Sequence, residues 1–180
     1  MTGSSAPPPA RVIHVLQGDF AVSSDPAVML TAVLGSCVSA CLHDPNAGVG
    51  GMNHFLLPDG GPERRDARLY GVHLMELLIN ELLRQGARKD RLIAKLFGGG
   101  RVVAGLTDIG AGNAAFARRF MKDEGIWCAA ESLGGDFGRR VRYWPATGVA
   151  RALQLSSIEP SPPPRPARNL EVSDGEVELF

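Results

Sequence analysis

One segment of the sequence has the residue types and spacing for nucleophilic chemistry. Cys37 directly follows Gly35 and Ser36, between two apolar runs that are typical of strands. A chain that bends at such a point exposes the thiol and turns backbone N–H groups toward it. A free cysteine has a pKa near ~8.5, so its thiolate needs a base or a positive partner nearby. The segment predicts a cysteine nucleophile, and buried packing is the alternative role for such a residue.

His54 is the candidate base for this cysteine. It ends the run Gly50-Gly51-Met52-Asn53-His54, on the return strand of a predicted hairpin. The turn signal Asp44-Pro45-Asn46 separates the two strands. Pairing of residues 38–43 with residues 49–57 brings His54 beside Cys37, and the strand glycines permit close backbone approach. The alternative for a lone histidine is a hydrogen-bonded polar residue without a catalytic role.

A metal site is a competing interpretation of the same residues. On an unbroken strand Cys37, Cys41 and His43 would share one face, and with His54 they would supply four ligands of kinds that zinc takes. The sequence has no C-x-x-C pair, and four residues along a strand separate two thiols by ~13 Å. We therefore expect neither a metal nor a cofactor.

Two glycine clusters are interpreted as turns rather than ligand sites. Gly98-Gly99-Gly100-Arg101 lacks the Gly-Lys-Ser/Thr ending of a P-loop, and predicts a tight turn after a strand. Residues 134–138 predict a hairpin turn.

The elements that must position these residues mix two periodicities. A helix is predicted around the apolar residues from Leu69 to Leu83, with a stop at Gly86, and a second helix over residues 114–124, with Asn113 as its cap and Gly125 as its end. Predicted strands cover residues 11–16, 28–34, 38–43, 49–57, 91–97, 126–130, 140–144 and 150–155. Strands in runs with two clear helices indicate an α+β fold.

Composition limits the class of protein. The chain has 180 residues, 44% hydrophobic and 21% charged, which is typical of one globular domain. Lys and Arg number 19, as do Asp and Glu, so no basic excess suggests nucleic acid as a partner. Three cysteines form no disulfide framework, which favours a reducing compartment. No apolar stretch reaches the ~20 residues of a membrane span, and the predicted location is the cytoplasm.

Proline marks both ends of the predicted domain. Eight of the 13 prolines lie within residues 1–10 and 158–180. Such segments are expected to be extended and flexible. The predicted domain therefore covers residues 11–157, after a disordered first segment and before an acidic tail, and a short docking segment at the end of that tail is the alternative.

Several segments together resemble the CheD family, the chemoreceptor glutamine deamidases of bacterial chemotaxis. The resemblance runs from about residue 12 to residue 155. The matching stretches are Leu34-Gly35-Ser36-Cys37-Val38, Asp44-Pro45, Gly51-Met52-Asn53-His54-Phe55-Leu56-Leu57-Pro58, Tyr70-Gly71, Gly86-Ala87, Lys95-Leu96-Phe97-Gly98-Gly99, Ile109-Gly110 with Asn113, Leu133-Gly134-Gly135, Gly138-Arg139-Arg140 and Pro145-Ala146-Thr147-Gly148. Two positions depart from the family pattern, Gly112 in place of arginine and Gly100 in place of alanine.

The resemblance implies a fold and a set of roles. The implied fold is a single-domain, β-sandwich-like core with a mixed sheet, flanked by helices, of the cysteine-hydrolase type. Cys37 is the implied nucleophile, His54 its base, and Thr31 the residue that orients the histidine by a hydrogen bond. Backbone and side-chain groups that bind the oxyanion or substrate are expected at Gly35, Ser36, Val38 and Asn53. Cys41 and Cys128 are expected to be structural.

The resemblance also implies a reaction and partners. The reaction is hydrolysis of glutamine side-chain amides on the cytoplasmic domains of chemoreceptors, which gives glutamate and ammonia. A CheC-type phosphatase is a further possible partner. The alternative function is a binding module that docks on receptor helices or on such a phosphatase with little or no turnover.

Overall fold

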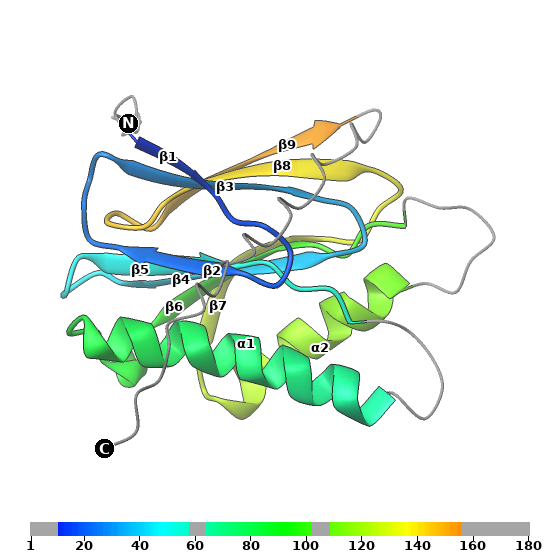
Figure 1. The fold of residues 1–180 in the computed structure, drawn as a ribbon, viewed down its shortest axis with the longest axis horizontal. Coiled ribbons are helices and arrows are strands. Elements are labelled where there is room, and N and C mark those ends of the chain that lie inside the picture. The colour runs from blue at the N-terminus through cyan, green and yellow to red at the C-terminus, as the bar shows by residue number, and fades with distance from the viewer. Residues whose placement is uncertain (1–10, 58–63, 102–108, 156–180) are drawn as a thin grey trace, which may run out of the picture.

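Two β-sheets and two helices form three layers, with the five-stranded sheet in the middle (Figure 1). The computed structural model describes residues 11–57, 64–101 and 109–155. The four-stranded sheet has the order β1-β3-β8-β9, and the five-stranded sheet has the order β2-β5-β4-β6-β7. Neighbouring strands are antiparallel except for the parallel pairs β1/β3 and β6/β7. The predicted α+β sandwich with flanking helices is confirmed.

The bounds of the elements agree with most of the predicted ones. The strands are β1 (Arg11–His14), β2 (Phe20–Ser23), β3 (Val28–Leu34), β4 (Val38–Asp44), β5 (Val49–Asn53), β6 (Ile93–Gly98), β7 (Trp127–Leu133), β8 (Gly138–Trp144) and β9 (Val149–Leu155). The helices are α1 (Arg64–Arg84) and α2 (Ile109–Asp123), with a 3-10 turn at Lys89–Arg91. The sequence analysis did not predict β2, which has only four residues.

Side-chain alternation on β4 divides the core into two halves. Val38, Ala40 and Leu42 point to the helices, where they pack with residues such as Leu78. Cys41 points the other way, into the cluster between the two sheets. Because successive side chains of a strand face opposite sides, one strand supplies both clusters. The middle sheet is therefore buried on both faces.

Close approach between the two sheets depends on Gly50. A Cβ at this position would lie 2.8 Å from the hydroxyl of Tyr143 and would overlap the carbonyl oxygen of Pro145. Tyr143 is fully buried, and its hydroxyl donates to the carbonyl of Leu42 at 2.8 Å. The expectation that strand glycines permit close packing is confirmed here.

The helix ends show where local signals sufficed. Gly86 has a φ of 97°, and the Ala87 N–H donates to the carbonyl of Leu82 at 3.0 Å, so the predicted stop of α1 is confirmed. The second helix begins at Ile109, earlier than predicted. Asn113 therefore lies within α2 and is not its cap. Its side chain makes hydrogen bonds to residues outside the helix.

The predicted hairpin at residues 134–138 is wrong. The strands on either side belong to different sheets, β7 to the five-stranded sheet and β8 to the four-stranded one. Gly134 and Gly135 both have positive φ, 79° and 78°, so the chain turns out of one sheet and into the other. The predicted turn after a strand at residues 98–100 is confirmed, since β6 ends at Gly98.

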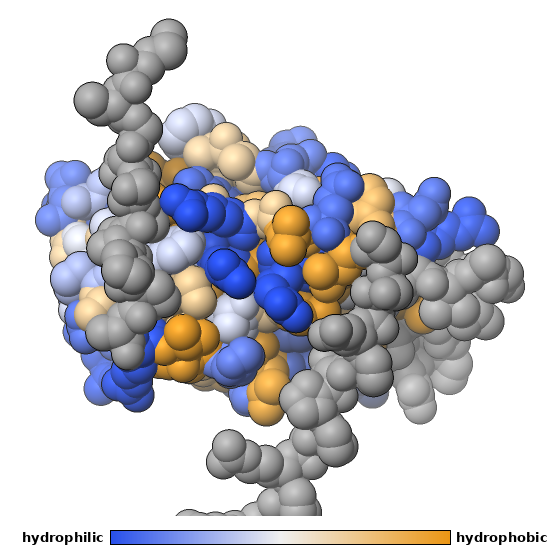
Figure 2. Space-filling model, turned by 90° about the horizontal axis from the view of Figure 1, so that it is seen from above, coloured by the Kyte–Doolittle hydropathy of each residue, from blue (hydrophilic) through white to orange (hydrophobic). Residues whose placement is uncertain are grey.

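The outer face of the four-stranded sheet is seen from above in Figure 2, where hydrophobic residues are interspersed with hydrophilic ones.

No helix within the described residues is long and apolar enough to cross a membrane. The predicted flexible ends, residues 1–10 and 158–180, lie outside the described residues.

Candidate active site

Cys37 lies where the chain crosses from one sheet to the other. Strand β3 belongs to the four-stranded sheet and β4 to the five-stranded sheet, and Gly35, Ser36 and Cys37 connect them. The bend predicted at this point is therefore present.

Three hydrogen bonds fix the carbonyl groups of this crossing. The Gly100 N–H donates to Gly35 O and the Gly99 N–H to Cys37 O, both at 2.8 Å. The side-chain amide of Asn113 donates to Ser36 O at 3.2 Å. These bonds hold the main chain around Cys37 from one side.

The turn behind Cys37 requires glycine. Gly98 has a φ of 111°, and a Cβ at this position would overlap the carbonyl oxygen of Cys37. Arg139, which is buried, braces the same turn: its guanidinium donates to Gly98 O at 3.2 Å and to Gly134 O. Its side chain also lies over the Phe137 ring, 4.5 Å from the centroid.

Asn113 joins α2 to the crossing and to the segment after β5, which contains His54. Its Oδ1 accepts from the Leu57 N–H at 2.7 Å, and its Nδ2 donates to Ile109 O at 3.0 Å as well as to Ser36 O. The side chain is fully buried and its hydrogen-bonding capacity is used. Asn113 is therefore a positioning residue that the sequence analysis placed only as a helix cap.

Strand pairing brings His54 to the same face as Cys37. Val38 and Phe55 form an antiparallel bridge, with N···O distances of 2.9 Å in both directions. Both of these side chains face the helices. Because side chains alternate, Cys37 and His54, one residue before each, point to the opposite face. Cys37 and His54 thus lie diagonally opposite each other, next to the paired residues Val38 and Phe55.

The imidazole of His54 is buried and held in one tautomer. Its Nδ1 lies 3.0 Å from the carbonyl oxygen of Val15. A carbonyl only accepts, so Nδ1 carries the proton and Nε2 has the lone pair. Nε2 is buried and has no hydrogen-bond partner within the described part of the chain. Burial lowers the pKa of His54, against the opposing effects of Val15 O and of the Asp19 carboxylate, so the ring is neutral and able to accept a proton.

The thiol of Cys37 is neutral as well. The residue is half-buried, and burial raises the pKa of the thiol to about 11, although its own backbone N–H acts in the opposite direction. The sulfur donates a hydrogen bond to Oε1 of Gln17 at 3.4 Å. Both pKa shifts favour a thiol and an imidazole over a thiolate and an imidazolium in the resting site.

Thr31 does not make the expected hydrogen bond to the imidazole. Its hydroxyl donates to Val141 O at 2.7 Å. Its neighbours on β3, Leu30 and Ala32, face the core between the sheets, so alternation directs Thr31 away from it. Thr31 is linked to the imidazole of His54 through the main chain of Val15 instead. The Val15 N–H donates to Thr31 O at 2.9 Å, and Val15 O accepts from Nδ1 of His54.

Two of the four predicted binding residues are engaged elsewhere. The Val38 N–H donates to Phe55 O and cannot also serve an oxyanion. Asn53 is fully buried; its Oδ1 accepts from the Ala40 N–H at 2.9 Å, and its Nδ2 donates to Met75 Sδ at 3.2 Å. Asn53 therefore ties β4 to α1 and does not reach the site. Gly35 and Ser36 do lie at the crossing beside Cys37.

Val15 and Gln17 are the site residues that the sequence analysis missed. Val15 acts through a backbone carbonyl, which any residue type supplies, so no side-chain pattern reveals it. Gln17 stands before a short strand that was not predicted.

The residues proposed for a zinc site are not assembled around one point. Cys41 is buried between the sheets, and the Nδ1 of His43 lies 3.0 Å from Pro145 O. No group of three or more His, Cys, Asp or Glu side chains within the described ranges is placed to hold a metal ion.

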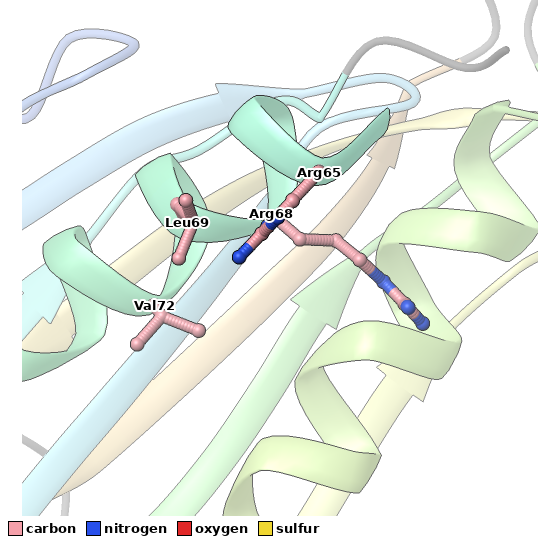
Figure 3. Close-up of a pocket in the computed structure, with 4 residues that line it drawn as sticks. All are labelled: Arg65, Arg68, Leu69 and Val72. Carbon is pink, nitrogen blue, oxygen red and sulfur yellow. The ribbon is translucent and has the colours of Figure 1, made fainter. Parts of the chain in front are cut away.

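A separate surface pocket lies on α1, lined by Arg65, Arg68, Leu69 and Val72 (Figure 3). All four residues come from the first half of this helix, so the pocket includes neither Cys37 nor His54.

Comparison with known proteins agrees with the residue pattern. The family model described as CheD chemotactic sensory transduction matches residues 56–153. A curated protein of Caulobacter vibrioides, named probable chemoreceptor glutamine deamidase CheD, is 52% identical over 184 aligned residues, which cover 97% of this chain and 96% of that protein. A protein of the same name from Rhizobium meliloti is 57% identical, over 83% of each chain.

Among solved structures, the hypothetical protein YfiH of Bacillus licheniformis is similar with a TM-score of 0.44 and 13% identity, over 63% of this chain and 50% of that one. That likeness is too distant to bear on function. The family model spans more than half of this sequence and the relatives match most of it at over 50% identity, so the chain belongs to the CheD family.

Proposed function

We propose that this chain is a chemoreceptor glutamine deamidase, which hydrolyses glutamine side-chain amides to glutamate and ammonia. The names of the curated relatives support this substrate. The observation that carries the chemistry is the imidazole of His54 on the face of Cys37: its Nδ1 is bound to Val15 O, and its buried Nε2 has no partner among the described residues. That arrangement is what a general base beside a cysteine nucleophile requires.

The first half of the reaction forms a thioester. Nε2 of His54 takes the thiol proton as Sγ of Cys37 attacks the amide carbon of the substrate. The carbonyl electron pair moves onto oxygen and returns as the C–N bond breaks. The proton on Nε2 passes to the leaving nitrogen, which departs as ammonia. Because both groups are neutral at rest, proton transfer accompanies the attack.

The second half consumes one water molecule. Nε2 takes a proton from water while the water oxygen attacks the thioester carbon. The C–S bond then breaks, and the sulfur recovers the proton from Nε2. The products are a glutamate side chain and the original thiol–imidazole pair, so no oxidant or reductant is needed.

Backbone N–H groups of the crossing would stabilise the oxyanion. The Cys37 N–H belongs to the nucleophile itself and lowers the pKa of its thiol, so it would be a donor close to the developing oxyanion. Ser36 and Gly35 precede it, with their carbonyls held away by Asn113 and Gly100. In other enzymes, one such donor contributes ~3 kcal/mol to transition-state stabilisation. Thr31 would contribute by fixing Val15, and through it the ring of His54.

The remaining expectations follow from the same proposal. The catalytic domain would cover residues 11–157 and act in the cytoplasm on the cytoplasmic domains of chemoreceptors. A CheC-type phosphatase would be a second partner.

The test is mass spectrometry of a chemoreceptor cytoplasmic fragment incubated with wild-type protein or with Cys37→Ala. We expect a gain of about one dalton at specific glutamines with wild type only, since the thioester cannot form without the sulfur. Cys128→Ala is the matched control, because that thiol lies on the edge strand β7 and bonds to Ala130 O; it should keep activity. A folded wild-type protein that leaves the fragment unchanged would favour the binding-module alternative.

A further inference from the structure

A glutamine of the chain itself contacts the nucleophile. The Cys37 thiol donates to Oε1 of Gln17 at 3.4 Å. Gln17 ends in a primary carboxamide, the functional group that the proposed reaction cleaves. A C=O bond is about 1.2 Å long, so the amide carbon of Gln17 lies no more than about 4.6 Å from the sulfur.

The backbone that carries Gln17 is fastened to the catalytic base. The Gly18 N–H donates to His54 O at 2.8 Å, and the His54 N–H donates to Asp19 O at 3.0 Å. Two residues before Gln17, Val15 O holds the imidazole. The segment around Gln17 is thus bound to His54 at three points, which fix the main chain on both sides of Gln17.

Gly18 allows the turn that aims Gln17 at the thiol. It has a φ of 89°, and a Cβ there would lie 2.8 Å from the hydroxyl of Tyr70. A residue with a side chain would be strained at this φ and crowded by Tyr70. The Asp19 N–H closes the turn on Leu16 O at 2.9 Å.

The contact with Gln17 is not arranged for reaction. Its amide oxygen accepts the thiol hydrogen, whereas a substrate oxygen would turn toward the backbone N–H groups of the crossing. Accepting that hydrogen stabilises the thiol over the thiolate. Gln17 is exposed, and one hydrogen bond to sulfur is weak enough for the side chain to rotate away.

We propose that Gln17 occupies the carboxamide subsite at Cys37 in the resting protein and competes with the substrate glutamine for it. This inference rests on the proposed function for the identity of the competitor. It assigns Gln17 an autoinhibitory contact: the side chain keeps the thiol protonated and covered until a substrate displaces it.

The test measures the rate at which iodoacetamide labels Cys37, followed by peptide mass spectrometry. Gln17→Ala should label about two- to tenfold faster than wild type, the range that one net hydrogen bond gives. Gln17→Glu keeps the length of the side chain but sets a carboxylate against the sulfur, so labelling should be slower than in wild type. Gln154→Ala, at an exposed position of β9, is the matched control and should label at the wild-type rate.

Labelling of Gln17→Ala at or below the wild-type rate would overturn the proposal, as would faster labelling of Gln17→Glu. A second measurement is KM for the receptor fragment, which should fall in Gln17→Ala by a factor similar to the gain in labelling rate. A raised KM would show that Gln17 helps to bind the substrate and would also overturn it. Since labelling needs no receptor, a failure of deamidation leaves this test intact and bears only on the proposed function.

Discussion

The neutral resting state of Cys37 and His54 predicts how the reactivity of the Cys37 thiol depends on pH. Burial raises the pKa of this thiol from 9.0 to about 11, and His54 is kept neutral by its own burial. At pH 7 the thiolate fraction is then about one in ten thousand, compared with about one in a hundred for a thiol with the starting pKa of 9.0. A more basic thiolate is intrinsically more nucleophilic, which recovers about tenfold of that difference.

We therefore expect the folded protein to label at Cys37 between about tenfold and about a hundredfold more slowly at pH 7 than the same chain in urea. The assay is iodoacetamide labelling over pH 6 to about 11, with Cys37 followed by peptide mass spectrometry. The rate should rise close to tenfold per pH unit without a plateau near neutrality. His54→Gln should leave this profile unchanged, because no imidazolium stabilises the thiolate at rest.

A labelling rate that reaches a plateau below about pH 8 would refute this reasoning, since it would require a thiolate already formed at neutral pH. Loss of that plateau in His54→Gln would identify the ion pair as its cause. In that case the proton would have moved before the substrate binds, and the general-base step of the proposed mechanism would be wrong.

Two further predictions concern Asp44 and Asn113, polar residues that hold the main chain of the domain in place. Asp44→Asn should lower the free energy of unfolding at pH 7 by about 3 kcal/mol in urea denaturation, because the fully buried carboxylate accepts from Arg91 and from the Arg88 N–H. Burial alone would raise the pKa of Asp44, but these hydrogen bonds lower it from 3.8 to about 2. The ionised carboxylate therefore stabilises the fold fully well above pH 3.8, and the difference in unfolding free energy between wild type and Asp44→Asn should vanish as the pH falls through about 2. A difference that persists below that pH would show that the hydrogen bonds of the carboxylate are not its cause. Asn113→Ala removes the hydrogen bonds to Ser36 O and the Leu57 N–H and should reduce kcat for deamidation more than it raises KM, whereas an unchanged kcat would show that the crossing keeps its shape without them.

The parts of the fold that the sequence predicted well are those with local signals. The stop of α1 before Gly86 and the hairpin of β4 and β5 depend on residues near one another in the chain. The same locality made His54 a candidate base for Cys37, because a short turn sets the pairing between their strands.

The wrong assignments arose where a local pattern fits two arrangements. Residues 134–138 have a composition that suits a hairpin, but the strands on either side, β7 and β8, pair in different sheets. The guanidinium of Arg139 holds the turn between them by hydrogen bonds to the carbonyls of Gly98 and Gly134. Asn113 has the residue type of a helix cap. Its amide bonds instead to segments 56 and 77 residues away in sequence, which no local window contains.

By itself, therefore, the sequence predicted Cys37 as the nucleophile and His54 as its base, since their chemistry is a property of residue type and their pairing follows from one hairpin. The tertiary structure alone decided which groups contact Cys37 and His54. It made Val15 the group that orients His54, turned the Thr31 hydroxyl toward Val141, and placed Gln17 on the thiol. Each depends on a backbone carbonyl or on the packing of two sheets, because burial and hydrogen-bond partners arise only when strands far apart in the chain come together.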